Sequence, residues 1–252
     1  MRKCYKLLKW DTKHFGYKVA LIENNNIDET TLDNVIKNLK RRNYRLAYWI
    51  VDSNLIKNKS LANKLGGVFV DERLLLKKRI YQNESRTSKR LKTNIVNKHA
   101  CFSMQSYIGK KITKRLKKLA LEAGRHSRFY IDDNFVNKEY YTLYINWMTN
   151  SLNGKNADYV FVYKKKNIEC GFITLTTKNK SLYIDLISVD YRYRRKGVGS
   201  ELIKKASEIA HSLKMSTIFV VTQKANINAV MFYKYLGFKI IKKSYIFHFW
   251  IN

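Results

Sequence analysis

The sequence predicts an α/β (α+β) fold in which strands and helices alternate along the chain. Short apolar, β-branched segments alternate along the 252 residues with longer segments whose apolar positions follow the helical period. Hydrophobic residues make up 45% of the chain and charged residues 27%, a balance typical of a globular protein. At roughly 100 to 200 residues per domain, the length allows one large domain or two modest ones.

The N-terminal part, residues 1–95, is predicted to form a small α/β lobe. Its expected strands are 5–10, 17–22, 48–51 and 68–80, and its expected helices are 29–40 and 55–65. The second helix ends at Gly66 and Gly67, where glycine is a common stop signal. The polar, charge-rich stretch 81–97 interrupts the pattern and is the predicted linker.

The pattern restarts in residues 96–252, the expected second domain. The expected strands are 101–106, 159–163, 170–176, 182–189, 217–222 and 239–250, and the expected helices are 112–123, 140–151, 199–213 and 227–236. Residues 47–78 and 217–250 share the order strand, helix, Leu-Gly, strand. Either a degenerate structural half precedes a working half, or two common units match by chance.

The formal net charge is +31, from 50 Lys and Arg against 19 Asp and Glu. Such a charge suits phosphorylated ligands or nucleic acid. The basic residues are spread over the whole chain without a zinc-finger, RNP or basic-zipper pattern, so we expect no stable nucleic-acid partner. No apolar run reaches the roughly 20 residues of a membrane helix. We therefore expect a cytoplasmic protein without a membrane span; its three scattered cysteines predict no metal site.

The most informative segment joins the strand 182–189 to the helix that follows it. A basic turn, a glycine pair and a helix start occur in succession: Arg194, Arg195, Lys196, Gly197, Val198, Gly199 and Ser200. A helix N-terminus offers free backbone N–H groups and the positive end of the helix dipole, and glycine lets the main chain approach a ligand closely. The segment therefore predicts a pyrophosphate site.

Two spaced motifs extend this prediction. Arg194-x-x-Gly197-x-Gly199 resembles the acyl-CoA-binding signature of the GNAT acyltransferase superfamily, and neither a dinucleotide fingerprint nor a P-loop is complete here. A second GNAT-like motif follows: Asn226-x-x-Ala229-x-x-Phe232-Tyr233-x-x-x-Gly237-Phe238. In it Asn226 suits a helix N-cap and Gly237 a helix end. The resemblance implies a GNAT fold with a mixed, splayed central sheet flanked by helices. A smaller N-terminal α/β lobe would precede it, and the internal repeat leaves open whether that lobe is a degenerate half of the same fold.

The resemblance also implies direct acyl transfer from acyl-CoA to an amine, without a covalent enzyme intermediate and without a metal. The strand from Leu186 to Val189 would splay from the strand beginning at Thr217, so that backbone groups at Ile187, Ser188 and Val189 hold the pantetheine arm and support the oxyanion. With the turn 194–200, Asn226 and Ala229, these residues form the expected CoA site. Tyr233 is the predicted general acid for the thiolate.

The attacking amine must lose a proton, and Asp185 is the predicted base, directly or through a water. His126 and His14 are weaker candidates, and a water chain alone is a further possibility. An ordinary hydrogen-bonding role for Asp185 in a half-buried strand is the structural alternative.

Three stretches make nearly the whole chain similar to the TDP-fucosamine acetyltransferase family of nucleotide amino-sugar N-acyltransferases. They are 8–20 (LKWDTKHFGYKVA), 126–129 (HSRF) with the aromatic run to Trp147, and 221–223 (VTQ). The resemblance implies N-acylation of a dTDP-linked amino-dideoxy sugar, such as dTDP-4-amino-4,6-dideoxygalactose, in lipopolysaccharide or O-antigen synthesis. The acyl group would be acetyl or a longer one such as hydroxybutyryl.

Five residues are the predicted acceptor site: Trp10, His14, Phe15, Arg128 and Phe129. Arg128 would bind phosphate, and the aromatic faces would stack on the sugar and the base. Alternatively, the aromatic residues only anchor the N-terminal lobe and Arg128 forms a surface ion pair. There are two competing functions. The enzyme could acylate an amine on a protein or a tRNA, or the chain could be a non-catalytic module that binds nucleic acid or another anion. The closing strand YIFHFW, residues 245–250, is expected to pair across a homodimer.

Overall fold

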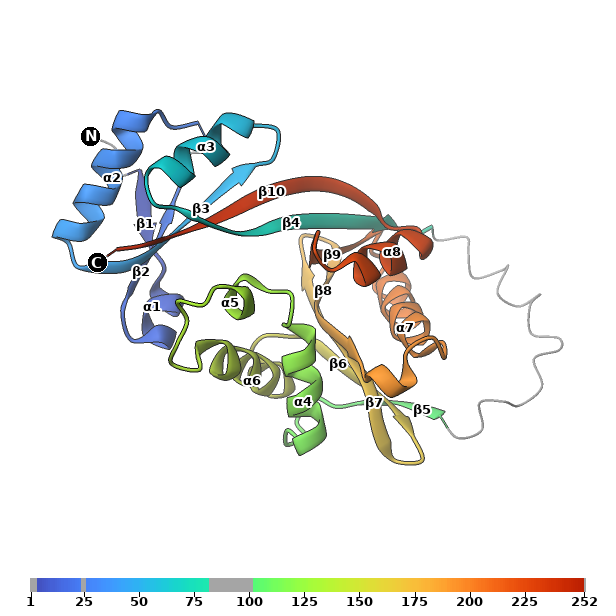
Figure 1. The fold of residues 1–252 in the computed structure, drawn as a ribbon. Coiled ribbons are helices and arrows are strands. Elements are labelled where there is room, and N and C mark those ends of the chain that lie inside the picture. Colours follow the sequence, from blue (N-terminus) through green and yellow to red (C-terminus); the bar gives the residue numbers. More distant parts are fainter. Residues whose placement is uncertain (1–3, 24–25, 82–101, 252) are drawn as a thin grey trace.

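The computed structural model describes residues 4–23, 26–81 and 102–251, and the described strands form one ten-stranded sheet (Figure 1). The strands are β1 (Tyr5–Leu7), β2 (Lys18–Ile22), β3 (Tyr44–Asp52), β4 (Val68–Arg79), β5 (Phe102–Ser106), β6 (Tyr159–Lys165), β7 (Ile168–Lys178), β8 (Ser181–Val189), β9 (Thr217–Gln223) and β10 (Lys239–Trp250). The helices are α1 (Lys9–Phe15), α2 (Glu29–Arg41), α3 (Ile56–Lys64), α4 (Lys114–Ala123), α5 (Arg128–Ile131), α6 (Glu139–Leu152), α7 (Val198–Ser212) and α8 (Ile227–Tyr235). The predicted mixed α/β class is confirmed.

The order of the strands is β1-β2-β3-β10-β4-β9-β8-β7-β6-β5, and its first eight strands are symmetric about the β10–β4 pair. β3, α3 and β4 in the N-terminal half correspond to β9, α8 and β10 in the C-terminal half. β10 pairs with β3 and β4 pairs with β9, so each unit places its last strand beside the first strand of the other. β2 runs parallel to β3, as β8 runs parallel to β9. This arrangement supports a degenerate first copy over a chance match.

The two copies differ at the point where the chemistry is expected. In the first copy, β2 stays paired with β3 up to its last residue, Ile22. In the second copy, β8 leaves β9 after Ile184. The first copy also has no glycine between β2 and α2, whereas Gly197 and Gly199 follow β8. Only the second copy therefore combines an opened strand pair with a glycine turn.

The last strand, β10, is an interior strand of the sheet. It pairs antiparallel with β3 over Ser244–Trp250 and with β4 over Lys239–His248. The expectation that the YIFHFW segment pairs across a dimer is therefore wrong, because residues 245–248 have a partner strand on both edges within the chain. A homodimer by another surface stays a prediction.

Helices cover both faces of the sheet, and each half has its own core. In the C-terminal half, α7 and α8 pack on one face around Leu202 and Ile218, and α4 and α6 pack on the other around Leu116 and Met148. In the N-terminal half, α2 and α3 cover one face, while residues of α1 and α5 lie against the other. The concave side of the sheet thus brings the N-terminal helix α1 next to α5 of the second half (Figure 1).

Two short helices differ from the sequence expectation. The first strand ends at Leu7, and residues 9–15 form the helix α1. The helix ends at Phe15 because Gly16 takes a left-handed conformation (φ 78°). Trp10 consequently lies on a helix with half of its surface exposed. Helix α5 lies between the expected helices 112–123 and 140–151, where no helix or strand was predicted. The predicted linker 81–97 and the expected boundary at residue 95 lie, apart from Tyr81, outside the described residues.

Candidate active site

The opened strand pair is the central feature of the site. β8 pairs antiparallel with β7 from Ser181 to Val189, but it pairs with β9 only from Leu182 to Ile184. The register between β7 and β8 shifts at Thr174, whose hydroxyl oxygen accepts a hydrogen bond from the Leu186 N–H at 2.9 Å. From Asp185 to Val189, the β9-facing edge of β8 is unpaired with β9. The divergence expected for this strand, at Ile187, Ser188 and Val189, is confirmed.

The glycine turn connects this open edge to α7. A 3-10 turn at Tyr191–Tyr193 follows β8, and α7 begins at Val198. Arg195 (φ 58°) and Gly197 (φ 81°) are both left-handed and reverse the chain before the helix. The Glu201 N–H bonds the Gly197 carbonyl as the first helical hydrogen bond, so the N–H groups of residues 198–200 precede the ladder. The turn presents the donors that a diphosphate requires.

Gly199 is needed for a second reason. A Cβ atom at this position would lie 3.0 Å from the Phe232 ring of α8. Glycine therefore allows the start of α7 to approach the Phe232 ring of α8 closely.

The three basic residues of the turn, Arg194, Arg195 and Lys196, differ in their contacts. The Arg194 guanidinium donates through Nε to the Val189 carbonyl at 3.0 Å and through its NH2 group to Glu122 at 2.9 Å. Arg195 and Lys196 are exposed at the turn. Arg194, Arg195 and Lys196 were all predicted to bind phosphate. In the structure, however, the Arg194 guanidinium is hydrogen-bonded to Val189 and Glu122 of the protein itself. Contact of Arg194 with the cofactor stays a prediction.

The second motif adopts the local structure that its sequence predicts. The Asn226 side chain caps α8 by accepting from the Ala229 N–H at 3.2 Å, and Gly237 ends the helix region with φ 85°. Tyr233 is buried, and its ring packs against Phe232 and Phe238 at 5.5 Å each. Burial raises the pKa of Tyr233, so its hydroxyl is protonated at neutral pH. Its role as general acid stays a prediction.

Asp185 lies where β8 begins to leave β9. Its Oδ2 accepts a hydrogen bond from the Thr176 hydroxyl at 2.6 Å. Burial and, to a smaller extent, the charge of Asp158 raise the pKa of Asp185 to about 6, although the Thr176 bond lowers it. The carboxyl is therefore ionised at pH 7 to 8 and can still accept a proton there.

The five predicted acceptor residues come together at the junction of the two halves. On α1, Trp10 stacks on His14 at 4.9 Å, and Phe15 lies 5.9 Å from Phe129 of α5, ring centre to ring centre. Arg128 of α5 lies over the Phe129 ring at 4.7 Å and over the Tyr48 ring of β3 at 3.9 Å. The ion pair considered for Arg128 on the surface is replaced by contacts with aromatic faces.

A polar cluster that was not predicted from the sequence lies near enough to Arg128 for its charge to act on His248. The Asp132 Oδ2 accepts from His248 Nδ1 at 2.6 Å and from Trp250 Nε1 at 2.9 Å. Burial lowers the pKa of His248 to about 4, so its imidazole is neutral. His248 could have been noticed as a polar residue in an otherwise apolar strand. Asp132 carried no signal for this cluster, because His248 and Trp250 are more than 100 residues away from it in the sequence.

Several buried polar atoms of this junction have no hydrogen-bond partner among the described residues. They are Tyr17 Oη, Ser127 Oγ, one terminal guanidinium nitrogen of Arg128 and His248 Nε2. Nearby on β4, burial raises the pKa of Asp71 to about 7, against the charges of Arg128 and Arg73. Unpaired buried donors and acceptors are costly, so the junction is a candidate binding site for a polar ligand.

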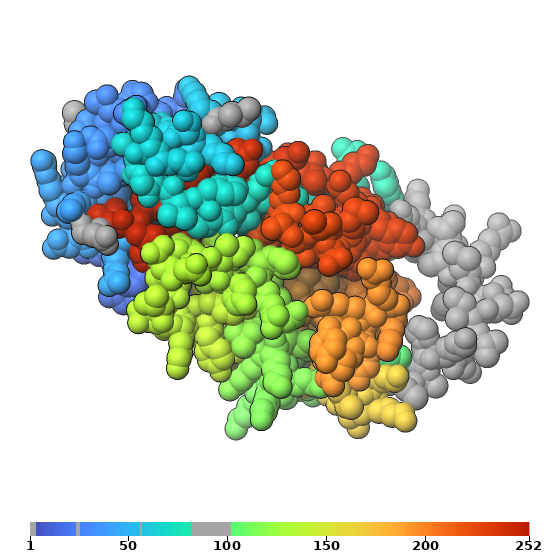
Figure 2. Space-filling view, viewed as in Figure 1, coloured from blue at the N-terminus to red at the C-terminus, as the bar shows by residue number. Residues whose placement is uncertain are grey.

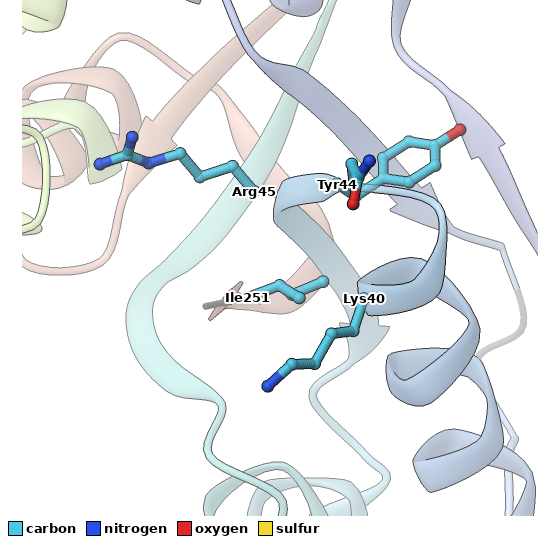
Figure 3. Close-up of a pocket in the computed structure, with 5 residues that line it drawn as sticks. Lys40, Tyr44, Arg45 and Ile251 are labelled. Atoms are coloured by element: carbon cyan, nitrogen blue, oxygen red, sulfur yellow. The ribbon is translucent and has the colours of Figure 1, made fainter.

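Other features are separate from this site. A groove of about 610 Å³ lined by Lys40, Asn43, Tyr44, Arg45 and Ile251 lies at the end of the N-terminal half (Figure 3). Within the described ranges, no cluster of three or more His, Cys, Asp or Glu side chains is arranged to hold a metal ion. No helix of the described chain is long and apolar enough to cross a membrane.

The comparisons with known proteins agree with an opened strand pair that ends in a glycine turn at a helix start. In agreement, residues 126–238 match the model of the Acetyltransferase (GNAT) family. The tandem GNAT protein from the clavulanic acid biosynthesis pathway has a similar structure, with a TM-score of 0.57 and 10% identity over 93% of this chain and 75% of that one. The GNAT fold is thus confirmed, and the match supports the expected enzyme class, a CoA-dependent N-acyltransferase.

Two curated proteins are similar to part of the chain. The uncharacterized N-acetyltransferase CgeE of Bacillus subtilis is 30% identical over 90 residues, which are 35% of this chain and 34% of that protein. The N-alpha-acetyltransferase 30 of Xenopus laevis is 33% identical over 70 residues, 28% of this chain and 25% of that protein. The chain therefore matches about a third and a quarter of the length of these relatives.

Proposed function

We propose that the protein transfers an acyl group from acyl-CoA to the amino group of a dTDP-linked amino-dideoxy sugar, in the synthesis of a bacterial surface polysaccharide. One observation carries the CoA part of this proposal: β8 leaves β9 after Ile184, directly before a glycine turn that exposes the first N–H groups of α7. The diphosphate of CoA would bind at Val198–Ser200, and the pantetheine arm would lie along the open edge of β8.

The residues around this edge supply the proton transfers. The amine attacks the thioester carbonyl carbon, and Asp185 takes the proton that the amine loses, directly or through a water. Backbone N–H groups of the open strand stabilise the oxyanion. The carbon–sulfur bond then breaks, and the Tyr233 hydroxyl donates its proton to the leaving thiolate. The products are an amide and free CoA.

The acceptor side of the proposal rests on the junction around Arg128. Burial lowers the pKa of Arg73, and the charge of Arg128 lowers it further. The two arginines are therefore close enough for their charges to interact. Such a pair favours an anionic group such as a diphosphate. The exposed Trp10 and the half-buried Phe15 and Phe129 offer faces for a sugar or a base. Residues 1–95 would then form the acceptor-side lobe and residues 96–252 the catalytic domain.

The test is incubation with acetyl-CoA or hydroxybutyryl-CoA and a panel of dTDP- and UDP-linked 3-amino and 4-amino sugars. We expect one dTDP-linked sugar to gain the mass of the acyl group, and Arg128→Ala to raise its KM. Release of CoA without any modified sugar in the panel would contradict the substrate class while leaving the enzyme class intact.

A protein amine is a second candidate acceptor. The similarity to an N-alpha-acetyltransferase over 70 residues favours it, and a net charge of +31 would attract an acidic partner. Acylation of peptides with free N-termini, with none of the nucleotide sugars, would favour this candidate.

A further inference from the structure

Helix α4 contacts the glycine turn through two side chains that lie two helical turns apart. Arg115 donates to Asp190 Oδ2 at 2.7 Å and to the backbone carbonyl of Glu169. Glu122, seven residues later, accepts from Arg194 at 2.9 Å. Figure 2 shows α4, in green, beside the orange segment that holds the turn and the start of α7. One helix face therefore carries both contacts.

These contacts fix both ends of the segment that leads from β8 into the turn. Asp190 directly follows β8, and its other carboxyl oxygen accepts from the Arg192 N–H at 3.0 Å. Arg194 also donates to the Val189 carbonyl at 3.0 Å. The chain from Val189 to Arg194 is thus bound to itself and to α4, immediately before the left-handed residues Arg195 and Gly197.

The start of α4 is itself anchored to the sheet. The Thr113 hydroxyl donates to Glu169 Oε2 at 2.8 Å, and the Tyr107 hydroxyl donates to Glu169 Oε1 at 2.9 Å. Glu169 belongs to β7 and is buried. Because both oxygens of this buried carboxyl are bonded, α4 is a fixed support and not a free surface helix.

We infer that Arg115 and Glu122 are positioning residues that hold the turn in the shape required by the CoA diphosphate. This inference rests on the proposed CoA site. The Glu122 contact directs the Arg194 guanidinium onto the protein, so that the exposed Arg195 and Lys196 and the N–H groups of α7 face the phosphates. The ion pair of Arg115 with Asp190 is the better shielded one, with side chains 28% and 11% exposed, against 49% and 31% for the pair of Arg194 with Glu122.

The test compares Glu122→Ala, Glu122→Gln and Arg115→Ala with the control Glu208→Ala. Glu208 also forms a surface ion pair, with Lys205 at 3.4 Å on α7, away from the turn. We expect Glu122→Ala to weaken CoA binding about fivefold in titration calorimetry, since exposed pairs have small effects, and Arg115→Ala to weaken it about tenfold. Glu122→Gln keeps an acceptor oxygen, so its CoA affinity should lie between that of Glu122→Ala and that of the wild type.

A second substrate separates positioning from general damage. S-acetylpantetheine lacks the diphosphate, so its kcat/KM should be the same in the variants and the wild type, whereas kcat/KM for acetyl-CoA should fall. Equal CoA affinity in Glu122→Ala and the wild type would overturn the inference, and so would equal losses for both substrates. A wild-type protein that binds no CoA would instead overturn the proposed function. If Arg115→Ala fails to fold, the more exposed Glu122 variants decide the question.

Discussion

Replacing Asp185 with Asn should make the protein more stable at alkaline pH and less active. Burial, as the main cause, raises the pKa of the Asp185 carboxyl to about 6, against about 3.9 in an unfolded chain. Below the pKa of the unfolded chain, the carboxyl is neutral in both the folded and the unfolded state and does not lower the free energy of unfolding. As pH rises through 6, the folded protein must ionise a desolvated group, and stability is lost. An Asn side chain avoids this cost and keeps an acceptor oxygen for the Thr176 hydroxyl.

The size of the effect follows from the pKa difference. A shift of roughly two units corresponds to at most about 3 kcal/mol, and water at the half-buried carboxyl reduces it toward about 2 kcal/mol. The advantage of the Asn variant should therefore grow about threefold between pH 4.5 and pH 8. Urea unfolding at the two pH values measures it. In parallel, kcat/KM of the wild type should fall below pH 6, and the variant should lose about 100-fold at pH 8.

The matched control is Asp133→Asn, at an exposed aspartate. It should change stability by less than about 0.5 kcal/mol at either pH. The reasoning would be refuted by an Asp185→Asn variant that is less stable than the wild type at pH 8, or by an advantage that does not grow with pH. Full activity of a more stable variant would refute only the role as a base.

Tyr233→Phe should keep the fold, because the ring contacts remain, and should lower kcat by about 100-fold; full activity from pH 7 to 9 would exclude the general acid. Gly199→Val should weaken CoA binding at least tenfold, because its Cβ would press on the Phe232 ring; unchanged binding in calorimetry would contradict the close approach of α7 and α8. Asp132→Asn should cost about 3 kcal/mol in urea unfolding, because it disrupts a buried bond to a neutral imidazole; a loss under about 0.5 kcal/mol would mean that this bond contributes little.

Local patterns predicted the parts of the structure that depend on neighbours in the sequence. The cap at Asn226, the end at Gly237 and the turn before α7 follow from residues a few positions apart, and all adopt the predicted conformations. The helical period of α7 and the apolar, β-branched residues of β8 were likewise visible in the sequence. The short helix α1 was missed because its seven residues give too little periodicity to separate a helix from a strand.

The features that depend on distant pairing could not be read in this way. The insertion of β10 between β3 and β4 brings residues near 245 beside residues near 50 and 72, and no local pattern encodes such a choice. The polar cluster of Asp132 and His248 has the same origin. The bond from Arg194 to Glu122 was also invisible, because a basic residue in a phosphate-like turn is equally compatible with a protein partner.

A crystal structure of the protein with acetyl-CoA is the most direct measurement. It should place the diphosphate oxygens within hydrogen-bonding distance of the N–H groups of Val198–Ser200, and the thioester between β8 and β9 beside Tyr233. A diphosphate bound elsewhere, or β8 and β9 closed by side chains in the complex, would contradict the proposed chemistry.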